Sequence, residues 1–392
     1  MPVLIRGLML AQALALSAAP LMVFAGGIIG AQLHPDPRFA TLPVAAMVSG
    51  TALAALPAAR LAARLGRKTL FLLGMLLGAV SALGAALAFN AGQFWLFVTS
   101  ALLFGAVAAV VQQFRFAAMA AVPAAQAPVV ASQLLLAGLV SAFLGPELTR
   151  LAQWFPQLGF TASFIGLSGL FVLAGLVLWL TMPATPAVDT QRLASGRSWP
   201  ELLQQRGLLL AMAAGACGYG VMAYIMTATP LSMTQGMGFS LDEARWVIQS
   251  HIVAMFLPSL ISGRLIRRFG GWWMIALGLV LMLVCVLVAW WDQTFVHYWA
   301  GLVLLGLAWN LLFVAGTAML GQFHQPEEAS RVQGVNDFLV FGAQAFAALA
   351  SGAVVLLFGW HGLLLSALPL LLLLAVMLVR TPRSEVAAEV NA

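Results

Sequence analysis

The feature that most constrains this chain is the recurrence of apolar stretches of about 20 residues along nearly its whole length. The 392 residues are 62% hydrophobic and only 8% charged, which is too little charge for a water-soluble protein of this size. A helix needs a stretch of this kind to cross the hydrocarbon core of a bilayer. The chain is therefore expected to be an all-α integral membrane protein.

Twelve stretches are expected to form membrane-spanning helices. They cover residues 7–31, 39–61, 69–90, 94–121, 127–150, 159–182, 207–232, 242–263, 271–291, 295–321, 331–358 and 361–380. One long polar stretch with three prolines, residues 183–206, divides them into two sets of six. This pattern predicts a six-helix bundle at 1–182, a cytoplasmic linker at 183–206, a second bundle at 207–382 and a cytoplasmic tail at 383–392.

The basic residues predict the orientation of these helices, because loops on the cytoplasmic side carry an excess of Lys and Arg. With a cytoplasmic N-terminus, fourteen of these residues lie inside: Arg6, Arg60, Arg64, Arg67, Lys68, Arg192, Arg197, Arg206, Arg264, Arg267, Arg268, Arg331, Arg380 and Arg383. Three lie outside, at Arg38, Arg150 and Arg245. Both termini are therefore expected in the cytoplasm. The net charge of +6 follows from this topology, so it is no argument for a nucleic-acid partner.

Two pairs of soft ligands stand close together in the second half of the chain. Met233 and Met237 are four residues apart, and so are His251 and Met255. In a helix, residues at this spacing share a face, about 5–6 Å apart at Cβ. Thioether and imidazole groups suit Cu(I), whereas Mg, Ca and Mn prefer oxygen ligands. The four residues are candidate metal ligands, with Met222 and Met226 as further steps of a path for the ion.

Packing is the alternative explanation for such methionines, because methionine fills irregular gaps in membrane helices. His251 favours the metal interpretation, since a histidine deep in a membrane helix needs a polar partner or a role. Ordered along the seventh and eighth spans, the ligands would lead from the outer mouth towards the middle of the membrane.

Three ionisable side chains are expected within membrane spans, where each suggests a function. Glu147 or Asp337 could carry a coupling proton, because burial favours the protonated carboxyl group. Arg115 and Asp337 could instead form a gate between the two bundles. Each of the three could also be a structural group beside a water-filled vestibule.

An arginine-rich turn occurs at corresponding places in the two halves, as ARLAARLGRK at 59–68 and GRLIRRFGGW at 263–272. The first copy resembles the loop signature of the major facilitator superfamily, G-x-L-A-D-R-x-G-R-K. The matching residues are Leu61, Ala62, Arg64, Gly66, Arg67 and Lys68. Ala59 and Ala63 depart from the pattern, at the positions of its first Gly and its Asp. The resemblance implies the major facilitator fold, transport by alternating access, and a conformational role for Arg64, Gly66, Arg67 and Lys68.

A narrower resemblance covers residues 232–270, which are similar to the bacterial copper importers of the CcoA type that supply cbb3-type cytochrome oxidase. It implies that Met233, Met237, His251 and Met255 handle copper. Copper would then be the transported substrate, with no prosthetic group, and would move inward across the bacterial inner membrane. A cytoplasmic copper chaperone or oxidase assembly factors would be the partners, and the protein would act as a monomer.

Two other functions remain open at this stage. The same fold could carry a small organic molecule such as riboflavin or a drug, with Tyr224, Trp246 and Trp309 stacking on its rings. The chain could also be a copper-binding assembly factor that transports nothing. An enzyme is not expected, because no Ser-His-Asp set, zinc motif or phosphate-binding loop stands where chemistry could use it.

Overall fold

The computed structural model describes residues 3–36, 39, 42–183 and 196–383. Within these ranges all regular structure is helical, and eleven helices are long and apolar enough to cross a membrane. A twelfth span is a bent pair, Trp246–Leu260 with Ser262–Phe269, whose axes differ by 51°. The expected all-α membrane architecture is therefore confirmed.

The chain forms two compact units. Unit 1 contains Met1–Val122 and Leu134–Ala194, and unit 2 contains Pro123–Gln133 and Ser195–Ala392. The division departs from the predicted bundle limits at Pro123–Gln133, which clusters with unit 2. Most of the predicted linker and tail, residues 184–195 and 384–392, lies outside the described residues.

Unit 1 is built from helices, some of which follow one another within a single candidate span. They are α1 (Val3–Ala15), α2 (Ala18–Leu33), α3 (Leu42–Leu65), α4 (Arg67–Asn90), α5 (Phe94–Gln112), α6 (Phe114–Ala120), most of α7 (Ala127–Glu147), α8 (Arg150–Trp154) and α9 (Phe160–Thr181). The single helix predicted for 7–31 is interrupted between α1 and α2, where Pro20 has no N–H to continue the helical bonding.

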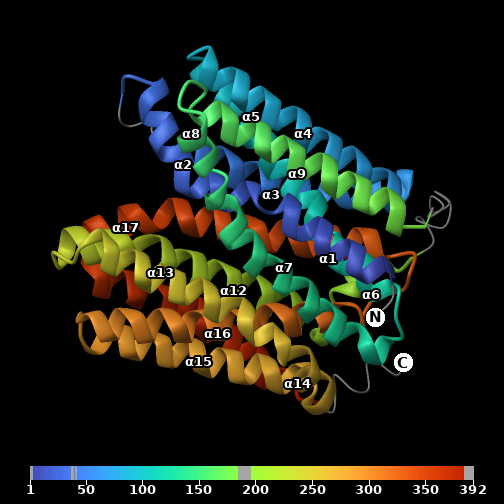
Figure 1. The fold of residues 1–392 in the computed structure, drawn as a ribbon. Helices are drawn as coiled ribbons and strands as arrows, with labels where there is room; N and C mark the ends of the chain where they lie inside the picture. The colour runs from blue at the N-terminus through green and yellow to red at the C-terminus, as the bar shows by residue number, and fades with distance from the viewer. Residues whose placement is uncertain (1–2, 37–38, 40–41, 184–195, 384–392) are drawn as a thin grey trace. The chain divides into compact units, whose positions relative to one another are not determined.

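Small residues bring the helices of unit 1 into close contact. A Cβ on Gly50 would lie 2.1 Å from the carbonyl oxygen of Leu102, and one on Gly105 would lie 2.0 Å from that of Met47. Only glycine therefore allows α3 and α5 to approach this closely, as in other membrane-helix interfaces. Helices α4, α5 and α9 lie side by side in the same unit (Figure 1).

Unit 2 contains the remaining elements. They are η2 (Ala124–Gln126), α11 (Trp199–Leu202), α12 (Arg206–Leu231), η3 (Ser232–Gly236), α13 (Leu241–Phe256), η4 (Leu257–Leu260), α14 (Ser262–Phe269), α15 (Gly271–Trp291), α16 (Phe295–Leu320) and α17 (Ala329–Arg380). The long α17 holds two spans joined at Gly359, whose φ of 70° breaks the helix. That break lies between the predicted spans 331–358 and 361–380.

The two arginine-rich turns have the same backbone geometry. Gly66 (φ 79°, ψ 149°) precedes α4, and Gly270 (φ 90°, ψ 155°) precedes α15. A positive φ is strained for residues with a Cβ, which explains why both turns use glycine. The sequence repeat is therefore matched by a structural repeat.

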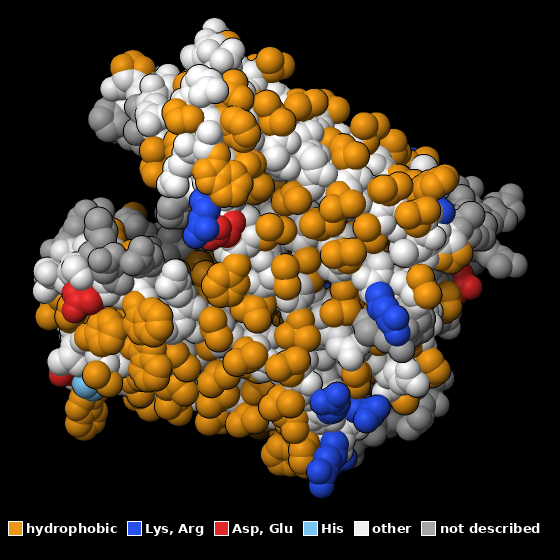
Figure 2. Space-filling view, viewed as in Figure 1, with side chains coloured by type: hydrophobic (Ala, Val, Ile, Leu, Met, Phe, Trp, Pro, Cys, Tyr) orange, Lys and Arg blue, Asp and Glu red, His pale blue; other side chains and the backbone are white. Residues whose placement is uncertain are grey.

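Hydrophobic side chains cover much of the molecular surface shown in Figure 2, with few charged groups among them. Leu83 and Leu87 on α4 and Trp291 on α15 are examples of large apolar side chains that are exposed. A surface of this kind suits lipid rather than water.

Candidate functional site

The end of α12 does not continue as a regular helix through the first predicted ligand pair. Residues Ser232–Gly236 form a π-helical turn, in which the N–H of Met237 donates to the carbonyl of Ser232, 3.1 Å away. Met233 is fully buried in this turn, whereas Met237 follows it and is 47% exposed. The two methionines of the predicted pair therefore differ in exposure, and their joint role as metal ligands stays a prediction.

A tyrosine that sequence reasoning missed holds this π-turn. The hydroxyl of Tyr298 on α16 lies 2.7 Å from Ser232 Oγ and donates to Gln293 Oε1 at 3.2 Å. Its ring packs against Phe239 and Trp360, at centroid distances of 6.1 and 5.1 Å. Tyr298 is buried. It is one of only three tyrosines in the chain, and this rarity was the feature of the sequence that could have identified it.

The second predicted pair lies on a regular part of α13. His251 is completely buried and Met255 is 7% exposed, one turn apart on the side of α13 that packs against α16. His251 Nδ1 lies 2.7 Å from the carbonyl oxygen of Leu302, so Nδ1 carries the proton and donates. Nε2 then presents a lone pair and has no partner among the described residues. Metal-binding histidines commonly have this arrangement, in which a carbonyl orients the ring and the other nitrogen is open.

Helix α13 ends in a break just below this pair. Pro258 cannot donate a backbone hydrogen bond, so the chain passes through η4 and bends into α14. Asn310 on α16 spans the break: its Nδ2 donates to the carbonyl of Met255 and to Ser259 Oγ, both at 2.7 Å. Gly306 allows α16 to pack closely against α13, since a Cβ there would lie 2.7 Å from the carbonyl oxygen of His251.

The donor set of this region is soft and neutral. Met222 is buried on α12 and Met226 is half-buried one turn later, so both remain candidates for a path towards η3. Within the described ranges, no three His, Cys, Asp or Glu side chains gather as a metal site. Any metal bound here would therefore depend on thioethers and His251, which suits a soft ion.

An aromatic cluster of buried and half-buried rings lies within unit 2. It consists of Tyr219, Phe256, Trp309, Phe313 and Phe341. Trp309 and Phe313 are stacked with an interplanar angle of 10°, and Tyr219 meets Trp309 edge-on at 5.2 Å. Trp309 Nε1 is buried and has no acceptor among the residues that the structure describes. Such a donor is costly to bury unless something binds it.

The three aromatic residues proposed from the sequence are not brought together. Trp309 belongs to the aromatic cluster, but Trp246 is 59% exposed at the start of a span. Tyr224 bonds through its hydroxyl to Ser366 Oγ at 2.8 Å. Tyr219 and Phe313 take their places beside Trp309.

The three candidate charges have different environments. Asp337 on α17 is 1% exposed and accepts a hydrogen bond from Asn336 Nδ2 at 3.1 Å. Arg115 is buried in α6, with its guanidinium 4.7 Å from the ring of Phe116. Glu147 departs from the expectation of burial: its side chain is 52% exposed and pairs with Arg150 at 2.8 Å. Arg115 and Asp337 belong to different units, so the gate between them stays a prediction.

The residues of the first arginine-rich turn tie helices of unit 1 together. Lys68 Nζ donates to the carbonyls of Trp179 and Met182, at 3.0 and 2.5 Å, where α9 ends. A cation at this position satisfies free carbonyls and complements the helix dipole. Arg67 donates to the carbonyl of Phe116, whereas Arg64 is exposed.

The described part of the predicted linker is docked onto unit 2. Glu328, 1% exposed, accepts hydrogen bonds from the backbone N, Nε and Nη2 of Arg197 at 2.7–2.9 Å, and from the backbone N–H of Gln325. The Arg197 hydrogen bonds lower the pKa of Glu328 to about 2. Arg331 donates back to the carbonyl of Arg197. This end of the predicted linker is therefore held against the start of α17 by a buried, charged contact.

Comparison with known proteins places these features in a family. The chain matches the Major Facilitator Superfamily over residues 8–231 and 211–391. It is 36% identical over 374 residues to the riboflavin transporter RfnT of Brucella anthropi, covering 95% of this chain and 94% of that protein. It is also 29% identical over 351 residues to the uncharacterised transporter YdeG of Bacillus subtilis, covering 85% and 81% of the two chains.

Solved structures share the fold at low sequence identity. The human organic anion transporter MFSD10 matches with a TM-score of 0.80 at 16% identity, over 96% of this chain and 99% of that one. A bacterial homologue of the iron transporter ferroportin matches with a TM-score of 0.71 at 16% identity, over 96% and 98%. The chain is therefore a multi-pass membrane transporter and belongs to the Major Facilitator Superfamily.

Proposed function

We propose that this transporter carries a small organic molecule with a planar aromatic ring system, of the riboflavin class. The observation that carries the proposal is the 36% identity to a riboflavin transporter along 95% of the chain. The copper function, expected from the ligand pairs, has no counterpart in the relatives compared and becomes the second candidate.

The aromatic cluster supports this cargo. Trp309 is stacked on Phe313, and its indole N–H has no acceptor among the described residues. A flavin ring system carries carbonyl and ring-nitrogen acceptors that could take this hydrogen bond. Buried aromatic surfaces with a few convergent polar groups are typical of organic ligand sites. We propose that the cargo ring packs against this cluster and accepts from Trp309 Nε1.

Uptake of radiolabelled riboflavin into proteoliposomes tests the proposal. The wild-type protein should accumulate riboflavin above protein-free vesicles. Trp309→Phe keeps an aromatic face but removes the donor, and loss of one hydrogen bond of about 1 kcal/mol should raise KM about fivefold. Trp309→Leu should raise KM further by removing the stacking surface. Trp273→Leu, at an exposed tryptophan on α15, is the matched control and should leave KM unchanged.

Absence of riboflavin uptake by well-folded wild-type protein would contradict the proposed cargo. Uptake with an unchanged KM in Trp309→Leu would retain the cargo but refute the aromatic cluster as its site.

Copper import is the second candidate, and it is favoured by His251 Nε2, which is buried without a hydrogen-bond partner among the described residues. Oriented by Leu302 and one turn from Met255, this nitrogen is arranged as a soft-metal ligand. Helix α13 also contacts the π-turn that holds Met233. We propose that Met237, exposed beyond the turn, would first meet the ion, and that Met233, His251 and Met255 would bind it deeper.

Radioactive copper uptake, measured in the same vesicles under reducing conditions, tests this candidate. If copper is the cargo, His251→Leu should abolish uptake, while His297→Leu near the start of α16 should not. A riboflavin KM that is unaffected by His251→Leu would separate the two sites. Copper binding without accumulation would instead favour an assembly factor, and uptake that survives in His251→Leu would refute the ligand role.

We further propose that the protein acts as a carrier rather than an enzyme, as a monomer in the bacterial inner membrane with both termini in the cytoplasm. The supporting observation is that fourteen basic residues lie on the side assigned to the cytoplasm and only three on the other side. Reporter fusions at each terminus test the orientation. A cytoplasmic copper chaperone or oxidase assembly factor is a partner only under the second candidate.

A further inference from the structure

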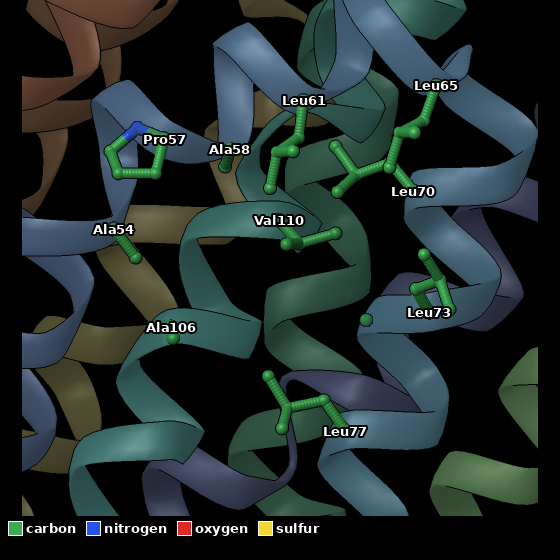
Figure 3. Close-up of a pocket in the computed structure, with 11 residues that line it drawn as sticks. Ala54, Pro57, Ala58, Leu61, Leu65, Leu70, Leu73, Leu77, Ala106 and Val110 are labelled. Carbon is green, nitrogen blue, oxygen red and sulfur yellow. The ribbon is translucent and has the colours of Figure 1, made fainter.

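An apolar crevice of about 260 Å³ opens on unit 1 between three helices. Figure 3 shows its lining, to which α3, α4 and α5 all contribute. The lining includes Pro57, Leu61 and Leu65 of α3, Gly74 of α4, and Ala106 and Val110 of α5. Leu61 and Leu65 are each 41% exposed and Leu73 is 48% exposed, so the crevice is open at the protein surface.

Two features of the sequence create this space. Pro57 lies inside α3 and cannot donate to the carbonyl four residues earlier, which weakens the helix at the crevice. Opposite it, Ala106 on α5 has only a methyl group, while Gly74 on α4 lets Val110 pack so closely that a Cβ there would lie 2.7 Å from Val110 Cγ1. Several leucines that could have filled this room remain partly exposed instead.

Two arginines stand beside the crevice near the end of α3. Arg64 lies seven residues after Pro57, which places it within about 20° of the same helix face. Arg60 lies one turn before Arg64, and both side chains are exposed. Neither makes an ion pair among the described residues. The sequences of α3, α4 and α5 contain no Asp or Glu at all, so these helices supply no counter-charge.

We propose that the crevice binds an anionic glycerophospholipid, with an acyl chain between α3, α4 and α5 and the phosphate headgroup at Arg60 and Arg64. An acyl chain matches the apolar lining, and the phosphate supplies the missing negative charge. Arginine suits phosphate because its guanidinium can donate two parallel hydrogen bonds. The arginines lie at the end of α3 predicted to be cytoplasmic, where anionic lipids attract basic residues. The site is independent of the cargo.

Native mass spectrometry of the purified full-length protein tests this site. The protein is titrated with phosphatidylglycerol and with phosphatidylcholine of identical acyl chains. The first molecule of phosphatidylglycerol to bind should have a lower Kd than the first molecule of phosphatidylcholine. Each arginine near an anionic lipid is worth about a fivefold change in affinity, so Arg60→Gln/Arg64→Gln should reduce the preference about 25-fold. Arg264→Gln/Arg267→Gln, an exposed pair on α14, is the matched control and should retain the preference.

A second variant tests the acyl-chain half of the site. Ala106→Phe places a ring in the crevice and should weaken both lipids while the arginines remain. Glycerol 3-phosphate, which has the headgroup charge but no acyl chain, should not displace phosphatidylglycerol. Equal binding of the two lipids by the wild type, an unchanged preference in the arginine pair, or displacement by glycerol 3-phosphate would each overturn the proposal. Variants are compared only where their melting temperature matches that of the wild type.

Discussion

Glu328→Gln provides a sharp test of how the segment around Arg197 is held on unit 2. Glu328 accepts three hydrogen bonds from Arg197 and one from the backbone of Gln325. Glutamine has nearly the same shape, but it removes the charge, and its amide NH2 group must face one of these donors. The substitution therefore tests the carboxylate while leaving the packing almost unchanged.

The lowered pKa of Glu328 gives the size of the expected effect on the opening of this segment. A change from 4.5 to about 2 is roughly 2.5 units, and each unit corresponds to 1.36 kcal/mol. The docked state is thus stabilised by about 3 kcal/mol through the charged form, which corresponds to about 100-fold in the opening equilibrium. Because the folded pKa is lowered, this stabilisation is fully present above about pH 4.5 and is lost as pH falls towards 2.

Hydrogen exchange of the native protein measures this opening directly, because the Arg197 amide donates to Glu328 Oε1. In Glu328→Gln its exchange should be about 100-fold faster at neutral pH. In the wild type, protection should fall as pH drops from about 4.5 towards 2, after correction for intrinsic exchange. The variant should show no such fall.

Glu201→Gln is the matched control. It removes the carboxylate that caps α11 through the Ser198 amide, but it leaves Glu328 in place. Its Arg197 amide should exchange as in the wild type. Equal Arg197 exchange in Glu328→Gln and wild type would refute the reasoning, since the charged contacts would then not hold the segment.

Three other substitutions test local structure. Asn310→Leu should lower stability by about 2 kcal/mol, seen as a lower melting temperature, because it leaves the Met255 carbonyl without its side-chain donor; an unchanged melting temperature would show that the contact is dispensable. Gly66→Ala should cost about 1 kcal/mol, since alanine is strained at φ 79°, and should also lower the melting temperature. Tyr298→Phe should increase hydrogen exchange in the π-turn, because the bond to Ser232 is lost; unchanged exchange would mean that the ring packing alone holds the turn.

The all-helical membrane architecture could be predicted from the sequence. A membrane span must be a helix that satisfies its own backbone hydrogen bonds, and its length and hydropathy can be recognised in the sequence. The arginine-rich turns at Gly66 and Gly270 were also readable, since both positions need a residue that tolerates positive φ. The pair His251 and Met255 lies on one face as the spacing predicted, because α13 is regular at that point.

The failures of sequence reasoning lie where distant contacts override local geometry. The sequence did not indicate that Ser232–Gly236 forms a π-turn bonded to Tyr298, 65 residues after Met233, or that Met233 is buried while Met237 is exposed. Glu147 was expected to be buried and instead pairs with Arg150 at an exposed position. A local sequence pattern does not predict which side chain will pair with another in the folded protein.

The sequence by itself determined that this chain is a twelve-span membrane protein with two related halves, because lipid imposes strict limits on length and polarity along each helix. The chemistry of the candidate sites was decided only by tertiary structure. Which nitrogen of His251 is open depends on the carbonyl of Leu302, 51 residues later. Likewise, the indole of Trp309, whose N–H has no acceptor among the described residues, lies among aromatic residues of α12, α13 and α17 as well as α16. These contacts join residues that are far apart in the sequence, so they exist only in the packed structure and no local sequence pattern predicts them.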